Sequence, residues 1–360
     1  MRDDLSQTLG GSLVLGSSPK GCEYCMKGSK IVVFMTGRCF AKCYYCPLSD
    51  IRKNSDTVYV NEVKAESDQI IIREAALIEA EGAGLTGGDP LLTFDKTLKY
   101  IKLLKDNFGS KFHIHLYTTG YNLNRERASA LIRNGLDEIR FHPIGDVTDK
   151  IKLFQGTEIK FGCEIPAIPG DERRVENLVK FLERAGADFI NINELEFSET
   201  NASELKKRGL KLKKDSIAAV EGSEETALRI LEWCRENTEE ISVHYCPSWI
   251  KDGVQLRNRF LRRARNVRKP YEEIDGEGLL VRGVAYLDEM HNIEEVRNML
   301  VKEYEVPEDM FEIDYFKKQV YTAWYIVEEL AGELAKINIK SGIVKSHPTD
   351  DRFIVMSYYL

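Results

Sequence analysis

Seven short apolar segments, each ending at a turn signal, recur along the first two thirds of the chain. The first two are KIVVFMTG at 30–37 and GAGLTGG at 82–88. Their length and their bounding glycines are typical of β-strands. The other five lie at 111–120, 136–143, 158–170, 187–195 and 240–245. The pattern therefore predicts seven strands before residue 250.

Amphipathic helical patterns separate these strands. The stretch 171–185 is an example, with one apolar stripe at the i, i+3, i+4, i+7 spacing of a helix face. Its members are Val175, Leu178, Val179 and Leu182. Strands that alternate with helices at this spacing predict βαβ units and a parallel sheet. We expect an α/β fold, a partial or near-complete (β/α)6-7 TIM-like barrel, in fewer residues than the ~250 typical of a full one.

The pattern changes after about residue 250. A basic stretch predicts a helical connector, and a strand–helix–strand–helix–strand order follows it, with its middle strand at 311–324. This order predicts a small C-terminal α+β domain, for which a ferredoxin-like fold is one option. The expected parts are an N-terminal segment, a barrel, a connector and this small domain, at 1–29, 30–248, 249–270 and 271–360.

Composition narrows the class of protein. The chain has 360 residues, 43% of them hydrophobic and 30% charged, and a net charge of −7. No apolar run approaches the ~20 residues of a membrane helix, and the start lacks the features of a secretory signal. We therefore expect a cytoplasmic protein with no membrane partner. Five of the eight cysteines lie between Cys22 and Cys46, which favours metal or redox chemistry over structural disulfides.

Three of these cysteines crowd into one loop after the first strand. Cys39, Cys43 and Cys46 form a CxxxCxxC pattern, and thiolates select zinc, Cu(I) or iron–sulfur clusters. A structural zinc site needs a fourth ligand, which Cys22 or Cys25 could supply. A cubane cluster held by three cysteines instead leaves one iron open to a substrate or cofactor.

A second motif, GGDP at 87–90, follows the second strand. Together the two motifs resemble the signatures of the radical S-adenosylmethionine superfamily, with Asp89 in place of the more common glutamate. The resemblance covers roughly 30–245. The whole chain is similar to an archaeal branch related to the pyruvate formate-lyase-activating enzymes.

The resemblance implies a [4Fe–4S] cluster on the three cysteines, with S-adenosylmethionine chelating the fourth iron. An electron from the cluster would cleave this cofactor to a 5′-deoxyadenosyl radical, which abstracts hydrogen from a substrate. A ferredoxin- or flavodoxin-like protein would donate the electron. Gly87 and Gly88 would let the backbone approach the methionyl group, Asp89 would help to accept from its ammonium, and Tyr45 would pack near the adenine.

Further cofactor contacts are expected at the strand ends. Arg140 and His142 alternate onto one face of the fourth strand, where they face the ribose or are satisfied locally as ordinary polar residues. Ile168 begins a turn that resembles the adenine-binding turn of the family. The remaining positions in this set are Pro90, Thr118 and Thr119.

A second group of cysteines raises the prospect of another metal site. Cys22 and Cys25 form a CxxC pair, and Cys246 with either Cys163 or His244 could complete a site for an auxiliary iron–sulfur cluster or zinc. Free or structural cysteines are the alternative. Cys163 and Glu164 are adjacent in one strand, so at most one of them faces the barrel interior.

The substrate is not specified by these motifs. RNA or a nucleotide, a peptide or protein, and a small metabolite all stay open. Seven basic residues in 257–269 indicate either a solvated helix or a surface for RNA or a phosphorylated molecule. Two alternatives without radical chemistry also stay open, a zinc-binding barrel and an RNA-binding protein with a structural metal site.

Overall fold

The computed structural model describes residues 2–8 and 10–360. The chain divides into two compact units, Met1–Leu256 and Arg257–Leu360. The division falls within the predicted connector, where a π-helical turn (Lys251–Leu256) precedes helix α9 (Arg257–Val267).

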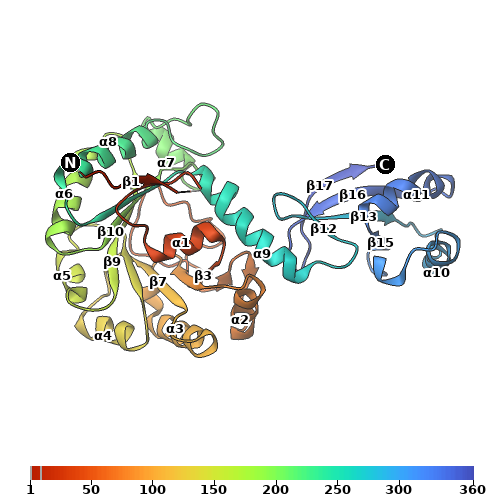
Figure 1. The fold of residues 1–360 in the computed structure, drawn as a ribbon, viewed down its shortest axis with the longest axis horizontal. Helices are drawn as coiled ribbons and strands as arrows, with labels where there is room; N and C mark the ends of the chain where they lie inside the picture. Colours follow the sequence, from red (N-terminus) through yellow and green to blue (C-terminus); the bar gives the residue numbers. More distant parts are fainter. Residues whose placement is uncertain (1, 9) are drawn as a thin grey trace. The chain divides into compact units, whose positions relative to one another are not determined.

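The first unit is built on a large sheet whose central strands are all parallel (Figure 1). The seven predicted strands form, and each pairs with the next one along the chain. They are β3 (Lys30–Phe34), β6 (Gly82–Thr86), β7 (His113–Thr118), β8 (Glu138–Phe141), β9 (Lys160–Ala167), β10 (Phe189–Glu194) and β11 (Ser242–Cys246). The predicted α/β fold with a parallel sheet is thereby confirmed.

Short antiparallel strands extend this sheet at both ends. The N-terminal segment adds β2 (Leu13–Leu15) to β11 and β1 (Leu5–Gln7) to β2. At the other end, β4 (Tyr59–Val60) pairs with β3, and β5 (Val63–Lys64) pairs with β4. The complete order is β1-β2-β11-β10-β9-β8-β7-β6-β3-β4-β5.

Helices cover the outer face of the sheet, as Figure 1 shows for α3, α4, α5 and α6. The main apolar core lies between this face and the helices, and Val175, Val179 and Leu182 of α6 are fully buried in it. The helices of this layer are α2 (Asp68–Leu77), α3 (Phe94–Phe108), α4 (Arg125–Arg133), α5 (Thr148–Ile151), α6 (Glu172–Arg184) and α8 (Ser223–Asn237), with 3-10 turns η1 (Pro90–Thr93) and η2 (Lys152–Phe154). Helix α7 (Ala202–Lys207) lies apart from it, with Leu205 buried in a separate small apolar cluster.

The inner face of the sheet carries buried polar side chains, among them His115, Glu138 and Arg140. Helix α1 (Lys20–Lys27) packs against this face (Figure 1). The backbone N–H of Gly21 donates to the Glu138 carboxylate at 3.3 Å. A Cβ at Gly21 would come within 2.6 Å of Nδ1 of His115. Only glycine therefore allows α1 to approach the side chains of β7 and β8 this closely.

The turn after β6 is joined to the backbone that follows β3. The N–H groups of Gly88 and Asp89 donate to the carbonyls of Thr36 (2.7 Å) and Arg38 (2.8 Å). A Cβ at Gly88 would collide with the carbonyl oxygen of Arg38. The absence of a side chain is thus required by contact between two turns, which is a different reason from the expected approach to a methionyl group.

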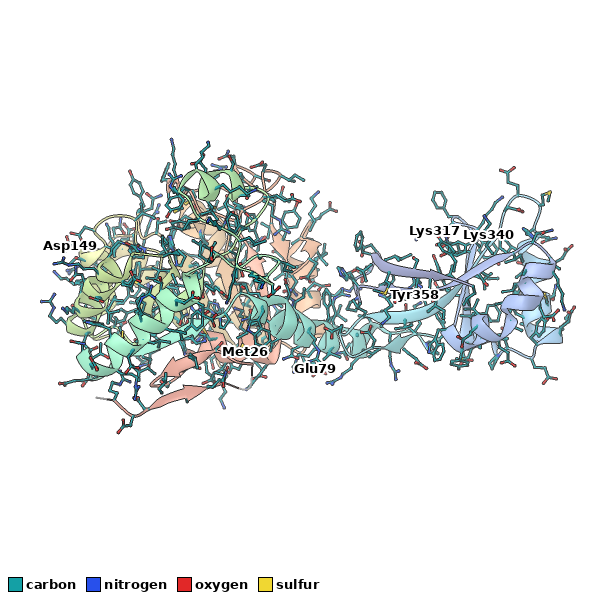
Figure 2. The ribbon with its side chains drawn as sticks, turned by 90° about the horizontal axis from the view of Figure 1, so that it is seen from above. Met26, Glu79, Asp149, Lys317, Lys340 and Tyr358 are labelled. Atoms are coloured by element: carbon teal, nitrogen blue, oxygen red, sulfur yellow. The ribbon has the colours of Figure 1, made fainter. Side chains whose placement is uncertain are left out.

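The second unit is an antiparallel sheet in the order β14-β15-β13-β16-β17, with β12 paired to β13. Its elements are β12 (Glu273–Ile274), β13 (Leu280–Tyr286), α10 (Ile293–Asn298), η4 (Met299–Glu303), η5 (Glu308–Met310), β14 (Phe311–Asp314), β15 (Gln319–Thr322), α11 (Trp324–Lys336), β16 (Lys340–Ser346) and β17 (Ile354–Tyr359). Figure 2 labels Lys340 of β16 and Tyr358 of β17.

The single strand predicted at 311–324 is wrong, because this stretch is a hairpin of β14 and β15. The Asp314 carboxylate accepts from the N–H groups of Phe316 (3.1 Å) and Lys317 (2.9 Å) and so builds the turn. Lys318 then takes a positive φ of 50°. Neither glycine nor proline signals this turn, so the pattern of residue types concealed it.

Among the residues that the structure describes, no helix is both long and apolar enough to cross a membrane.

The buried histidine on β7 predicts a loss of stability in mild acid. Burial, with the nearby positive charges of Arg140 and Lys30, lowers the pKa of His115 well below its usual range. The unfolded chain therefore takes up a proton below about pH 6.5 that the folded chain excludes. The free energy of unfolding should fall below that pH by up to about 1.4 kcal/mol per pH unit from this residue.

Urea unfolding from pH 7.5 to 5 tests this, with Trp233 and Trp249 fluorescence followed in a Trp324→Phe background so that the first unit alone reports. A His115→Gln chain should show a shallower pH dependence. Equal slopes in the two chains would contradict the assignment.

The contact at Gly88 predicts a position that rejects any side chain. Gly88→Ala should lower the free energy of unfolding of the first unit by about 1–3 kcal/mol, the usual cost of overpacking. Gly332→Ala is the control, because nothing lies within 4 Å of its added methyl group and helix α11 favours alanine. Denaturation of both variants measures the difference, and an unchanged G88A chain would refute the close contact.

Candidate active site

The three clustered cysteines lie in the loop between β3 and β4, which contains no helix or strand. Cys39, Cys43 and Cys46 are free thiols and each is partly exposed. The Cys46 N–H donates to the Cys43 carbonyl at 3.1 Å, which makes one turn of the loop. Burial raises the pKa of the Cys39 and Cys43 thiols.

Within residues 2–8 and 10–360, no three His, Cys, Asp or Glu side chains are gathered closely enough to hold a metal ion. The three thiols therefore share one loop without converging on a point. Their electrostatic influence on one another still reaches across the loop, since both Cys43 and Cys46 raise the pKa of Cys39.

Tyr45 and His142 form a pair that links the cysteine loop to the end of β8. Nδ1 of His142 lies 2.9 Å from the carbonyl of Glu164, and Nε2 lies 2.9 Å from the Tyr45 hydroxyl and 3.9 Å from Sγ of Cys43. Burial lowers the pKa of His142 and so favours the neutral ring. Because a carbonyl only accepts, Nδ1 carries the proton, and Nε2 accepts from the Tyr45 hydroxyl.

Asp89 is a buried connector between two strand ends. Its carboxylate accepts from the Leu91 N–H (3.0 Å), the Thr118 hydroxyl (2.9 Å), and the Thr119 N–H (3.1 Å) and hydroxyl (2.5 Å). Pro90 follows as the first residue of η1 and its carbonyl accepts from Thr97 at 2.8 Å. These groups hydrogen-bond to one another. The first role of Asp89, Thr118 and Thr119 is therefore to join the turns after β6 and β7. Their contact with a cofactor stays a prediction.

Arg140 lies deep in the inner face, 2% exposed, between two carboxylates. Its Nε donates to Glu138 at 2.5 Å and its Nη1 donates to Glu164 at 2.7 Å, while Nη2 finds no hydrogen-bond partner among the described residues. Burial, the largest single influence, would raise the pKa of Glu138, but the charges and hydrogen bonds of Arg140 and His113 together outweigh it and hold that pKa at about 2. No pattern in the sequence pointed to Glu138, and the expected ribose contact of Arg140 stays a prediction.

Glu164, rather than Cys163, faces the inner side of the sheet. Its carboxylate accepts from the amides of Asn191 (3.0 Å) and Asn193 (2.9 Å) on β10. Cys163 is fully buried in the apolar core under the outer helices. The prediction that these neighbours face opposite sides is confirmed.

The second cysteine group is only partly brought together. Cys22 and Cys25 of α1 lie close enough to Cys246 to raise the pKa of its thiol, which burial raises most, to about 12. His244 is on the same face of β11, two residues before Cys246. Cys163 lies on the opposite face of the sheet and so is separated from this group. The Cys22 thiol accepts from Asn191 at 3.4 Å and the Cys246 thiol accepts from Gln255 at 3.8 Å.

Two segments pack against the cysteine loop, the turn after β9 and the segment between β10 and β11. Ile168, expected at an adenine-binding turn, packs with Tyr44 and Tyr45 in a small apolar cluster. The Asn201 amide donates to the Tyr45 carbonyl at 3.0 Å, and the Arg208 guanidinium lies 4.0 Å from the centre of the Tyr44 ring. Asn201 and Arg208 were not predicted, because nothing in the order of residues links them to a loop some 160 positions away.

Several arginines of the basic helix α9 already have partners within the second unit. Arg257 donates to the Gly276 carbonyl at 2.6 Å, and Arg263 is 1% exposed and pairs with Asp350 at 3.5 Å. Arg259 and Arg262 also have partners. These contacts favour the structural interpretation of the connector over a phosphate-binding surface.

Family models match two parts of the chain. The model described as "Radical SAM superfamily" matches residues 33–145, and one described as "Domain of unknown function (DUF8061)" matches residues 278–358. A protein of Methanocaldococcus jannaschii is 40% identical over 349 residues, which cover 92% of this chain and 90% of that protein. It carries the provisional name glycyl-radical enzyme activating enzyme.

Solved structures show more distant similarities. SuiB of Streptococcus suis, bound to S-adenosylmethionine, matches at a TM-score of 0.44 and 14% identity, over 61% of this chain and 50% of that chain. The protein anSMEcpe with bound AdoMet and the Kp18Cys peptide matches at 0.43 and 13% identity, over 77% and 80%. Both are too distant to assign a contact or a substrate here.

The matched region 33–145 contains both the cysteine loop and the turn at 87–90, and the archaeal relative extends the similarity over nearly the whole chain. The chain therefore belongs to the radical S-adenosylmethionine superfamily and is an enzyme that uses a [4Fe–4S] cluster and S-adenosylmethionine.

Proposed function

We propose that Cys39, Cys43 and Cys46 hold the cluster and that the enzyme generates a radical on a protein substrate. The observation that carries the first part is the donor set: three free, partly exposed thiols on one irregular loop that follows a strand of a parallel sheet. Ligands in such folds bind beyond the carboxyl ends of the strands.

The residues present fit a cluster with one open iron. Three thiolates suit three irons, and a loop without regular structure leaves the thiols free to converge when metal binds, since binding and local ordering are coupled. The backbone of the turn at 87–90 is hydrogen-bonded to the start of this loop, so the second family motif is adjacent to the first.

When bound, the cluster supplies the electron for reductive cleavage of S-adenosylmethionine. The protein's own groups position and shield this chemistry. His142, fixed by the Glu164 carbonyl, accepts from Tyr45 beside the Cys43 thiol. Asp89 keeps the turns after β6 and β7 together. The segment around Asn201 covers the outside of the loop.

The name of the archaeal relative supports a protein substrate. An activating enzyme for a glycyl-radical enzyme acts on a protein, and that relative aligns over 90% of its own length with this chain. RNA is less well supported, because the arginines of α9 are engaged inside the second unit. The electron donor in this proposal is a ferredoxin- or flavodoxin-like protein of the cytoplasm.

The finer architecture belongs to the same proposal. Seven consecutive parallel strands with helices on their outer face support a partial (β/α)6-7 barrel. The order β14-β15-β13-β16, with α10 and α11 as the connections, supports a ferredoxin-like domain extended by β17. The predicted parts 1–29, 30–248, 249–270 and 271–360 stay a proposal.

Removing one proposed ligand should abolish cleavage of the cofactor. After anaerobic reconstitution and reduction, the native chain should convert S-adenosylmethionine slowly to 5′-deoxyadenosine without added substrate, and Cys43→Ala should form no more than the protein-free blank. Cys234→Ala is the matched control, because Cys234 is buried in α8. Chromatography of the products measures both, and substantial 5′-deoxyadenosine from C43A would refute the ligand assignment.

A further inference from the structure

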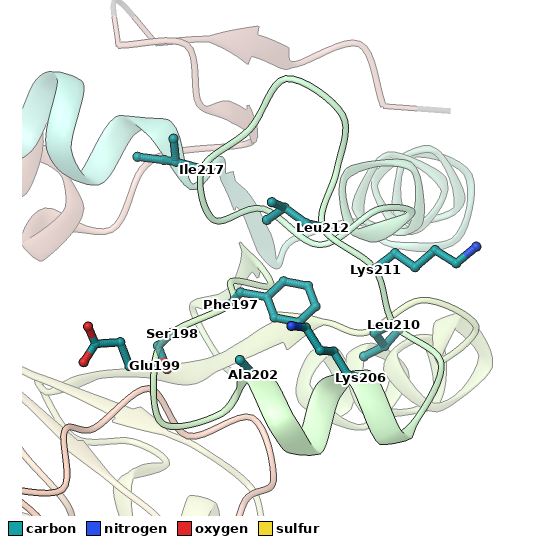
Figure 3. A pocket seen from close by; sticks show the side chains of 9 residues that line it. All are labelled: Phe197, Ser198, Glu199, Ala202, Lys206, Leu210, Lys211, Leu212 and Ile217. Carbon is teal, nitrogen blue, oxygen red and sulfur yellow. The ribbon is translucent and has the colours of Figure 1, made fainter.

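A pocket of about 550 Å³ opens in the segment between β10 and β11 (Figure 3). Its apolar lining comes from Ala202, Leu210, Leu212 and Ile217, together with the ring of Phe197. Its polar lining comes from Ser198, Glu199, Lys206 and Lys211. Ile217 is 93% exposed and Leu212 is 49% exposed. Apolar side chains left this open to solvent mark a surface that gains free energy when a partner covers it.

The pocket adjoins the cysteine loop. Phe197 and Leu210 of its lining belong to the small apolar cluster that also includes Tyr44 and Tyr45. Asn201, next to the lining residue Ala202, donates to the Tyr45 carbonyl at 3.0 Å. A partner seated in the pocket would therefore lie beside the loop that carries the proposed cluster ligands.

Within the segment that forms the pocket, one stretch is strongly basic although the protein is acidic. The stretch KKRGLKLKK at 206–214 has six positive residues and no acidic one, whereas the whole chain has a net charge of −7. Lys207 and Arg208 pair with Glu204, and Lys213 pairs with Glu224. In the part of the chain that the structure describes, the lining residues Lys206 and Lys211 form no ion pair, and they outnumber the lining carboxylate of Glu199.

We propose that this pocket and its two lysines dock an acidic segment of the protein substrate, with one aliphatic side chain inserted in the pocket. The inference rests on the proposed function and names the chemistry of its partner. The aliphatic lining receives the side chain, and Lys206 and Lys211 attract carboxylates on either side of it. An RNA chain fits less well, because base stacking needs aromatic platforms and the lining has a single phenylalanine.

A peptide probe tests the proposal on the full-length, cluster-loaded enzyme with S-adenosylmethionine present. The probe is a fluorescein-labelled peptide with one leucine between two pairs of glutamates, and its Kd is measured by fluorescence anisotropy. We expect K206E/K211E to weaken binding about tenfold, as reversal of two exposed charges implies. We expect L212S/I217S to weaken it by a similar factor, because both side chains leave the pocket.

Two controls make the result specific. K102E/K111E reverses two exposed lysines at other positions of the first unit and should change Kd less than about twofold. A peptide with serine in place of leucine should bind more weakly to the native chain, with no further loss in L212S/I217S. Equal losses in K206E/K211E and K102E/K111E would overturn the proposal, and so would oligo-uridine of equal charge that competes as well as the peptide.

The outcome is separable from the proposed radical chemistry. Lys206, Lys211, Leu212 and Ile217 lie outside the proposed cofactor site, so substrate-free formation of 5′-deoxyadenosine should be unchanged in both pocket variants. Loss of peptide binding with intact cleavage supports the docking site. Intact peptide binding in both pocket variants refutes it, whatever the cleavage assay gives.

Discussion

The buried carboxylate of Asp89 is the interaction on which the arrangement of the site depends. It accepts hydrogen bonds from the turn after β6, through Leu91, and from the turn after β7, through Thr118 and Thr119. A carboxylate that is 2% exposed would be costly to bury without such partners. Because the same turn bonds to Thr36 and Arg38, the start of the cysteine loop is held in register with two neighbouring strand ends.

The inner face of the sheet likewise buries charged side chains together with their hydrogen-bond partners. Arg140 forms ion pairs with both Glu138 and Glu164, and the amides of Asn191 and Asn193 complete the hydrogen bonding of Glu164. Paired in this way, charges can be retained in an interior where single ones would not be tolerated. The Glu164 carbonyl also orients His142, so the buried network and the cysteine loop meet at one histidine.

The sequence predicted the fold where local signals were strong. Glycines marked the ends of strands such as 30–37 without any knowledge of which strands pair. The order of strands and helices then implied a parallel sheet. The hairpin at Asp314 was missed because its turn is built by a carboxylate and by Lys318 at positive φ, without glycine or proline.

The site residues also fall into two groups, those that a local pattern in the sequence indicates and those that only folding brings together. The motif at 39–46 could be located from the spacing of its cysteines, and the one at 87–90 from its place after a strand and its resemblance to the family signature. By contrast, the role of Asp89, the pairing of Tyr45 with His142, and the contact of Asn201 with the loop depend on which way side chains face across long separations. Such orientations arise only from tertiary packing. The pocket beside Tyr44 belongs to this class, since it joins a basic stretch to a cluster of apolar residues from other segments.

The central claim is that three cysteines of one loop hold a cluster whose fourth iron is open to the cofactor. Electron paramagnetic resonance of the anaerobically reduced enzyme, recorded before and after addition of S-adenosylmethionine, tests it most directly. The account predicts a [4Fe–4S]+ signal whose g values shift on addition, because the cofactor becomes a ligand. A signal that does not change on addition, or a reconstituted protein that binds no iron, would contradict it.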